Sequence, residues 1–271
     1  MKKSVVHADG TFDCLTAPLQ GKLEDVAPIA AKIGYEALQL TIHEPSKENA
    51  EEIKNILGKH GLSVSSIATG LSYTKDGLCI ASGNEDNRKK AVQRMKEYID
   101  LAYTLDKAKV GIGAIRGRTS DASNREEYDK QLYKSMQEIL SYAAERDVVI
   151  ILEQMSHNLS DVFVKVEETA EYIRKFESPY FKLQLDSIHL YSENEDAYTS
   201  IVKNKDIIGQ VDISDVDRMC PDGNHFDFPS LIKALKEINY KEYLIFEYRM
   251  APPQNAALIG FDYINKLINE N

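Results

Sequence analysis

The chain has 271 residues and a formal net charge of −10, with 43% hydrophobic and 28% charged residues. Nucleic acid and anionic membrane surfaces are bound through a basic face, so this charge argues against either as the main partner. The composition is that of a soluble globular protein. No apolar run approaches the roughly 20 residues of a membrane span. The start, Met1–His7, lacks the apolar stretch of a signal peptide and is predicted to be a strand instead.

The cysteines are few, scattered and odd in number: Cys14, Cys79 and Cys220. They form neither a disulfide framework nor a metal knuckle, which fits the reducing cytoplasm. We therefore expect a cytoplasmic protein.

Apolar runs rich in β-branched residues alternate along the chain with segments that carry a helical stripe. The predicted strands are Lys2–Ala8, Tyr35–His43, Leu62–Thr69, Ala108–Ile115, Val148–Glu153, Phe181–Asp186, Ile207–Asp212 and Tyr243–Glu247. The predicted helices are Lys22–Gly34, Lys47–His60, Asn84–Leu105, Arg125–Arg146, Val166–Phe176, Glu195–Lys205, Pro229–Ile238 and Pro253–Asn269.

Local signals mark several ends of these elements. Gly34 and Gly61 are predicted to end helices, and Ser46 and Ser123 to begin them. Leu71–Gly83 is predicted to be a loop long enough to line a site. Eight strands alternating with eight helices predict an α/β fold with parallel strands, a single-domain (β/α)₈ TIM barrel over residues 1–271. The pattern by itself also allows an open sheet.

Four of the predicted strands end in an acidic residue, namely Glu153, Asp186, Asp212 and Glu247. Successive acids are separated by roughly 30 residues, the length of one βα unit. The ends of barrel strands meet at one face, so the four carboxylates are expected to converge and to need a cation among them. The alternative is that each acid separately caps a helix or opens a turn. We expect a divalent metal site.

Several stretches resemble the xylose isomerase-like TIM barrels of the sugar isomerase and epimerase superfamily. The match is general at Lys32–Leu40 (KIGYEALQL) and sharper at Ile150–Met155 (IILEQM) and Leu183–Tyr191 (LQLDSIHLY). It is most specific at Gly223–Glu247, where turn, helix and strand follow in order. The superfamily includes ketose 3-epimerases, hydroxypyruvate isomerase, inositol-catabolism isomerases and, more distantly, endonuclease IV.

The resemblance implies roles for individual residues. Glu153, Asp186 and Glu247 fall on three of the family's four metal ligands. His189, three residues after Asp186, falls on a substrate-binding histidine, and Arg218 falls on an arginine that contacts substrate oxygens. The chain would then bind a small-molecule carbohydrate.

One position departs from the family pattern. The fourth metal ligand is usually a histidine at the end of strand seven, in a His-x-His pattern that here reads Gln210-Val-Asp212. With Asp212 in the ligand set, four carboxylates would favour a hard cation, Mn²⁺ or Mg²⁺, with Co²⁺ or Zn²⁺ as alternatives.

The resemblance implies a metal-dependent sugar or polyol isomerase or epimerase that transfers a proton next to a carbonyl through an enediolate. Glu153 and Glu247 would be the acid–base pair, with His189 and Arg218 orienting the substrate. Two alternatives stay open. One is a non-catalytic or degenerate carbohydrate-binding barrel, and the other is an endonuclease IV-like phosphodiesterase. The oligomeric state is open as well, a homo-oligomer included.

Some further side chains near strand ends are candidates for lining the same site, although a surface ion pair is an equal alternative for the arginines. They are His7, His43, His157, His225, Arg116 and Arg118.

Overall fold

The computed structural model describes residues 1–10, 16–253 and 255–270. The strands of the described residues form one sheet. They are β1 (Lys2–Ala8), β2 (Leu19–Gln20), β3 (Ala37–Thr41), β4 (Ser63–Ala68), β5 (Lys109–Ile112), β6 (Ile150–Glu153), β7 (Phe181–Asp186), β8 (Ile208–Ile213) and β9 (Tyr243–Phe246).

The strand order is β2-β1-β3-β4-β5-β6-β7-β8-β9, and β1 also pairs with β9. The pairing between β1 and β9 closes the sheet. Parallel pairing is found for β1–β3, β1–β9, β4–β5, β5–β6 and β8–β9. The predicted (β/α)₈ barrel is thereby confirmed. The two-residue strand β2 pairs only with His7 and Ala8, beyond the part of β1 that pairs with β9, and the sequence pattern does not reveal it.

Helices connect the strands of the described chain. They are α1 (Leu23–Ile33), α2 (Ala50–Gly58), α3 (Gly70–Thr74), α4 (Glu85–Thr104), α5 (Arg125–Glu145), α6 (Val166–Arg174), α7 (Ser187–Ser192), α8 (Ala197–Lys203), α9 (Phe228–Glu237) and α10 (Ala256–Asn269). Four single 3₁₀ turns of the described residues add to these, η1 (Pro45–Lys47), η2 (Ala114–Arg116), η3 (Thr119–Asp121) and η4 (Val216–Arg218).

The chain divides into two compact units. The first unit consists of Met1–Leu40, Ile53–Ser65 and Gln184–Asn271. Its core holds the ring of Tyr35, which packs edge-on against Phe246 of β9 and Phe261 of α10 at centroid distances of 5.1 and 5.0 Å. Gly34 ends α1 in a left-handed conformation (φ 113°), as predicted, and a side chain there would collide with Phe261.

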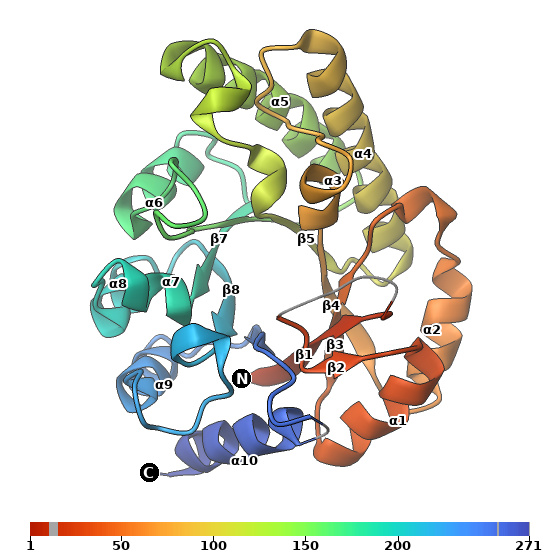
Figure 1. The fold of residues 1–271 in the computed structure, drawn as a ribbon, viewed down its shortest axis with the longest axis vertical. Coiled ribbons are helices and arrows are strands. Elements are labelled where there is room, and N and C mark those ends of the chain that lie inside the picture. Colours follow the sequence, from red (N-terminus) through yellow and green to blue (C-terminus); the bar gives the residue numbers. More distant parts are fainter. Residues whose placement is uncertain (11–15, 254, 271) are drawn as a thin grey trace. The chain divides into compact units, whose positions relative to one another are not determined.

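The second unit consists of Thr41–Glu52 and Ser66–Leu183. Its two long helices, α4 and α5, lie side by side (Figure 1). The guanidinium of Arg88 on α4 is buried between them and donates to Ser135 and Glu138 of α5, at 2.9 and 3.0 Å. A buried cation needs such partners, so this contact fixes how the two helices pack.

Two predicted helix caps are wrong, although the predicted start of α5 at Arg125 is confirmed. Ser46 lies within η1, and α2 begins after Asn49, whose side chain accepts a hydrogen bond from the Glu52 amide. The cap of α5 is Asn124 rather than Ser123, and it accepts from the Glu127 amide. In each case an asparagine close by supplied the carbonyl oxygen that the exposed amides of the first turn need.

Two short helices were not predicted. α3 occupies the beginning of the expected loop Leu71–Gly83, and α7 follows directly after Asp186, without an intervening loop. Both are too short to show a helical stripe in the sequence.

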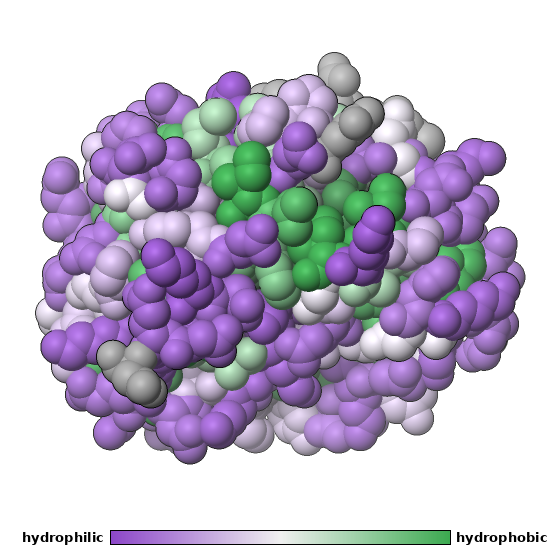
Figure 2. Space-filling model, turned by 90° about the horizontal axis from the view of Figure 1, so that it is seen from below, coloured by the Kyte–Doolittle hydropathy of each residue, from purple (hydrophilic) through white to green (hydrophobic). Residues whose placement is uncertain are grey.

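The surface agrees with the charged composition. Figure 2 shows one face that is mostly hydrophilic around a hydrophobic area. None of the helices in the described part of the chain combines the length and the apolar character that crossing a membrane requires.

Cys79 and Cys220 are buried and free, while Cys14 lies outside the described residues.

The imidazole of His7 on β1 makes stability depend on pH. Its Nε2 lies 2.8 Å from the Gly21 carbonyl oxygen, and burial lowers its pKa, although that hydrogen bond and the charge of Asp9 act in the opposite direction. The unfolded chain therefore binds a proton at this histidine before the folded chain does, so stability falls as pH drops below about 6.5. His7→Gln, which keeps a donor for Gly21, should lose stability less steeply between pH 7.5 and 5.5 in urea denaturation.

His60→Gln is the matched control, because His60 is exposed at the end of α2. It should keep the pH dependence of the parent chain. Equal slopes for His7→Gln and the parent chain would show that His7 does not carry this dependence.

Candidate active site

Asp186 is the last residue of β7 and the N-cap of α7. Its side chain is fully buried, and Oδ1 accepts a hydrogen bond from the Ile188 amide at 3.1 Å. The next residue, Ser187, holds this turn against the end of β8, since its hydroxyl donates to the Ser214 carbonyl oxygen and accepts from the Ser214 amide. Strand, turn and helix together therefore fix the position of the carboxylate.

Arg218 supplies the cation that a buried carboxylate needs. Its Nη1 lies 2.5 Å from Asp186 Oδ2 and 3.6 Å from Glu247 Oε2. Glu247 is the residue directly after β9. Arg218 and Asp217 both have left-handed backbones (φ 58°), an uncommon conformation for residues other than glycine. The backbone carbonyl of Arg218 accepts from the Arg249 amide at 2.7 Å, which holds this turn beside the end of β9.

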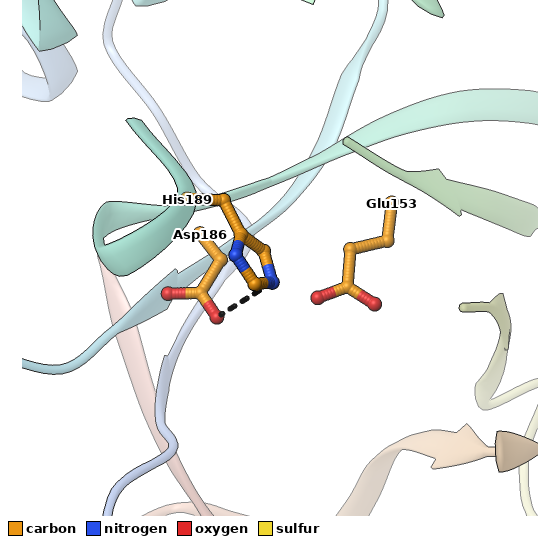
Figure 3. Close-up of side chains that lie close together, drawn as sticks. All are labelled: Glu153, Asp186 and His189. Carbon is orange, nitrogen blue, oxygen red and sulfur yellow. Dashed lines mark ion pairs between the residues drawn. The ribbon is translucent and has the colours of Figure 1, made fainter. Parts of the chain in front are cut away.

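His189 lies one helical turn after Asp186, on α7 (Figure 3). Its Nε2 is 4.0 Å from Asp186 Oδ2 and 3.4 Å from Arg218 Nη2. A guanidinium only donates, so a hydrogen bond between these two groups requires Nε2 to be the acceptor. Asp186, His189, Arg218 and Glu247 thus lie together in the first unit.

Asp212 has different surroundings. Its two carboxylate oxygens accept hydrogen bonds from Gln210 Nε2 at 2.8 Å and Gln184 Nε2 at 2.7 Å, and all three side chains are buried. Gln210 also donates to Gln39 Oε1 at 2.9 Å. We call Gln39, Gln184, Gln210 and Asp212 the amide network. Asp212 pairs with Ile245 in the β8–β9 register, two residues before Glu247.

The sequence carries a signal for this network that the predictions did not use. Gln184-Leu-Asp186 and Gln210-Val-Asp212 are the same Gln-x-Asp pattern on neighbouring strands. Residues two apart on a strand point to the same face, so each glutamine accompanies its acid into the barrel.

Glu153 is the last residue of β6 and belongs to the second unit. Its carboxylate lies over Gly113, where an added Cβ would be 2.7 Å from Oε2, so a side chain at that position would displace the carboxylate. Arg116 donates from Nη1 to the Glu153 carbonyl oxygen. Burial lowers the pKa of Arg116, which is fully buried, and its Nε and Nη2 have no hydrogen-bond partner among the described residues.

The remaining candidates are in varied surroundings. His43 Nε2 is 2.9 Å from Asp76 Oδ1 at the surface, and Arg118 donates to the Leu159 carbonyl oxygen at 2.9 Å. His157 is exposed. His225 lies on the loop after η4, 3.7 Å from Asp215.

The residues of the first unit fit a divalent cation. Asp186 and Glu247 both face one positively charged group, Arg218 Nη1, and two carboxylates that share a cation this way could share a metal ion. His189 Nε2 offers a nitrogen donor close by. Asp212 fits less well, because each of its oxygens already accepts from a glutamine amide.

The chain belongs to the family described as xylose isomerase-like TIM barrel, whose model matches residues 27–267. Among curated proteins it is 25% identical to L-ribulose 3-epimerase of Methylomonas sp. (strain DH-1), over 80% of this chain and 75% of that protein. It is 24% identical to 2-oxo-tetronate isomerase of Haemophilus influenzae, over 88% of this chain and 90% of that protein.

Solved structures agree in fold. D-psicose 3-epimerase of Clostridium cellulolyticum H10, solved with D-tagatose, superposes with a TM-score of 0.85 at 15% identity, covering 98% of this chain and 99% of that one. A structure of L-ribulose 3-epimerase gives 0.84 at 18% identity, covering 99% and 95%. Together with the curated relatives, which are epimerases and isomerases, the family confirms the predicted class of enzyme, an isomerase or epimerase.

Asp212→Asn tests whether the amide network needs a carboxylate. The new amide would place an NH₂ group against a glutamine NH₂ group, leaving buried donors without an acceptor. We expect a loss of about 1–3 kcal/mol in the free energy of unfolding, measured by urea denaturation.

Asp217→Asn is the matched control, because Asp217 is exposed and asparagine tolerates its left-handed backbone. It should change stability little. A stability of Asp212→Asn equal to that of this control would mean that the network does not depend on the charge.

Proposed function

We propose that the chain is a metal-dependent sugar or polyol isomerase or epimerase that transfers a proton at the carbon next to a carbonyl. The observation that carries this proposal is the cluster of Asp186, His189, Arg218 and Glu247, which combines carboxylates, an imidazole and a guanidinium beside two strand ends. Relatives named L-ribulose 3-epimerase and 2-oxo-tetronate isomerase support a hydroxylated carbonyl compound as substrate.

The metal site would be formed by Glu153, Asp186 and Glu247, with Asp212 as the fourth predicted ligand. Glu153 comes from the end of β6, and the strand ends of a barrel supply the residues of one site. Oxygen ligands favour Mn²⁺ or Mg²⁺, with Co²⁺ or Zn²⁺ as alternatives if His189 contributes its nitrogen. When bound, the ion would polarise the substrate carbonyl as a Lewis acid.

The protein's own groups would move the proton. Glu153 would remove it from the carbon next to the carbonyl, and Glu247 would return one. Return to the opposite face of the same carbon gives epimerisation, whereas return to the neighbouring carbon gives isomerisation. His189 and Arg218 would hold substrate oxygens and stabilise the negative charge of the enediolate.

Glu153→Gln removes the proposed base and keeps the shape of the side chain. We expect a loss of about 10²–10⁴-fold in turnover, the usual contribution of a positioned acid or base. The measurement is exchange of substrate hydrogen for deuterium, followed by NMR over a panel of ketoses with Mn²⁺. The same assay after EDTA treatment should show no exchange.

Glu145→Gln serves as its control, because Glu145 is exposed at the end of α5. It should exchange at the parent rate. Full activity of Glu153→Gln, or undiminished exchange after metal removal, would refute the proposed chemistry.

Arg218→Gln tests whether the Arg218 guanidinium occupies the position that the metal ion would take. Without Arg218, the carboxylates of Asp186 and Glu247 lose the cation that faces them. The metal-free variant should lose about 3 kcal/mol of stability or more, as expected for a buried charge left alone. Its affinity for Mn²⁺, measured by calorimetry, should rise about tenfold, equivalent to about 1.4 kcal/mol.

Arg249→Gln is the matched control, since it removes the same charge from an exposed side chain close by in the chain. It should leave both quantities near the parent values. Weaker binding of Mn²⁺ by Arg218→Gln would show that Arg218 supports the ion instead of occupying its place.

Three predictions from the sequence complete the proposal. Residues 1–271 act as a single TIM barrel domain, the protein works in the cytoplasm, and its main partner is a carbohydrate rather than nucleic acid or a membrane. Light scattering will decide between a monomer and a homo-oligomer.

A further inference from the structure

The loop between β8 and α9 holds a second cluster of residues that could ligate a metal, outside the site described above. Asp215, Asp222 and His225 each offer one ligand atom, and these atoms lie within 4.8 Å of one another. All three residues belong to the first unit. Neither the family pattern nor the proposed chemistry uses them.

Asp215 is the residue that makes this cluster more than a group of surface charges. Its side chain is 1% exposed. Oδ1 accepts hydrogen bonds from the Val216 and Phe226 amides, at 2.7 and 3.1 Å. Oδ2 is buried and has no hydrogen-bond partner among the described residues. A buried carboxylate oxygen without a partner is costly, and a cation would satisfy it.

The Asp215 carboxylate is enclosed by the loop that carries the other two ligands. The Asp215 amide donates to the Met219 carbonyl oxygen at 2.8 Å, and Phe226 donates to Oδ1 from the far end of the loop. His225 Nδ1 is 3.7 Å from Oδ1. The ring is too far away for a hydrogen bond but near enough for both groups to contact one ion.

The surroundings are negatively charged. Burial raises the pKa of the neighbouring Cys220 thiol, and the charges of Asp222 and Asp215 raise it further. The same two carboxylates contribute to the raised pKa of Tyr263, again after burial. The loop therefore concentrates negative charge, and the imidazole of the cluster, His225, is largely exposed.

We propose that Asp215, Asp222 and His225 form a site for a divalent transition-metal ion of the Zn²⁺ class, with water completing its coordination. Two carboxylates and an imidazole are the donors that Zn²⁺ accepts, whereas Mg²⁺ and Ca²⁺ prefer oxygen alone. The ion would connect the beginning of the loop, at Asp215, to its end, at His225. It would thereby hold η4 and the Arg218 side chain that η4 carries.

The test is calorimetric titration of the full-length protein with Zn²⁺. The double variant Asp222→Asn/His225→Gln removes two ligands that are exposed, so the fold should tolerate the change. Asp217→Asn is the matched control, because it removes an exposed carboxylate of the same loop that lies outside the cluster. Circular dichroism in the absence of metal should show the same thermal transition for all three proteins.

We expect the double variant to lose one bound Zn²⁺ per chain, with its affinity at that site weakened about 100-fold or more, since changes to outer partners alone cost about 10–100-fold. Asp217→Asn should bind as the parent chain does. Zn²⁺ binding by the double variant with the same stoichiometry and affinity as Asp217→Asn would overturn the proposal.

Glu247→Gln separates the two sites. If it loses a different Zn²⁺ from the one lost by the double variant, both sites exist. If it loses none while the double variant still loses one, the loop site stands and the metal site of the proposed function does not take Zn²⁺. If it abolishes all Zn²⁺ binding, the loop site is overturned.

Discussion

The candidate site depends on the burial of Asp186 beside a single cation, Arg218. Asp186 is fully buried, and burying a carboxylate is costly unless positive charge and hydrogen-bond donors surround it. The Ile188 amide and the Arg218 guanidinium meet this need from two directions. To reach Asp186, Arg218 takes a left-handed backbone, as does Asp217 before it. Strained conformations of this kind persist where the surrounding structure requires them, and they are common at functional sites.

The amide network explains how the chain can carry an acid where its family usually carries a histidine. The two carboxylate oxygens of Asp212 accept amide hydrogens of Gln184 and Gln210. Such donors stabilise the charged form of a carboxylate. Asp212 also lies two residues lower in the barrel than Glu247. The departure from the family pattern therefore reaches beyond position 212, since Gln210, one of the two glutamines that hold the acid, stands at the other histidine of the His-x-His pattern.

The sequence predicted the barrel because eight apolar runs alternate with eight helical segments, and four of the runs end in an acidic residue. This pattern placed the acids of β6, β7 and β9 at the strand ends, where Glu153, Asp186 and Glu247 are found. It could not reveal β2 or α7, because two to six residues carry no readable period. Nor could it reveal the residues that cap the beginnings of α2 and α5, since neighbouring polar residues compete for the same amides.

Prediction of the site was limited for a different reason. Acids, His189 and Arg218 can be recognised from their residue types and from the family resemblance. Their partners cannot, because hydrogen bonds such as Gln210 to Gln39 join residues far apart in the chain. A glutamine on a strand looks the same in the sequence whether it contacts water or a buried acid. Only the barrel, by placing β3 and β8 in one sheet, determines whether such a glutamine contacts water or a buried acid.

The segment after β8 ties the geometry of the site to a second group of charges. Arg218 is three residues after Asp215, whose carboxylate holds the Val216 amide and whose backbone amide binds the Met219 carbonyl oxygen. These two hydrogen bonds enclose the left-handed turn at Asp217 and Arg218. Any change that moves the Asp215 carboxylate must therefore be transmitted over one short turn to the guanidinium. The cation that balances Asp186 is in this way positioned by an acid that does not contact it.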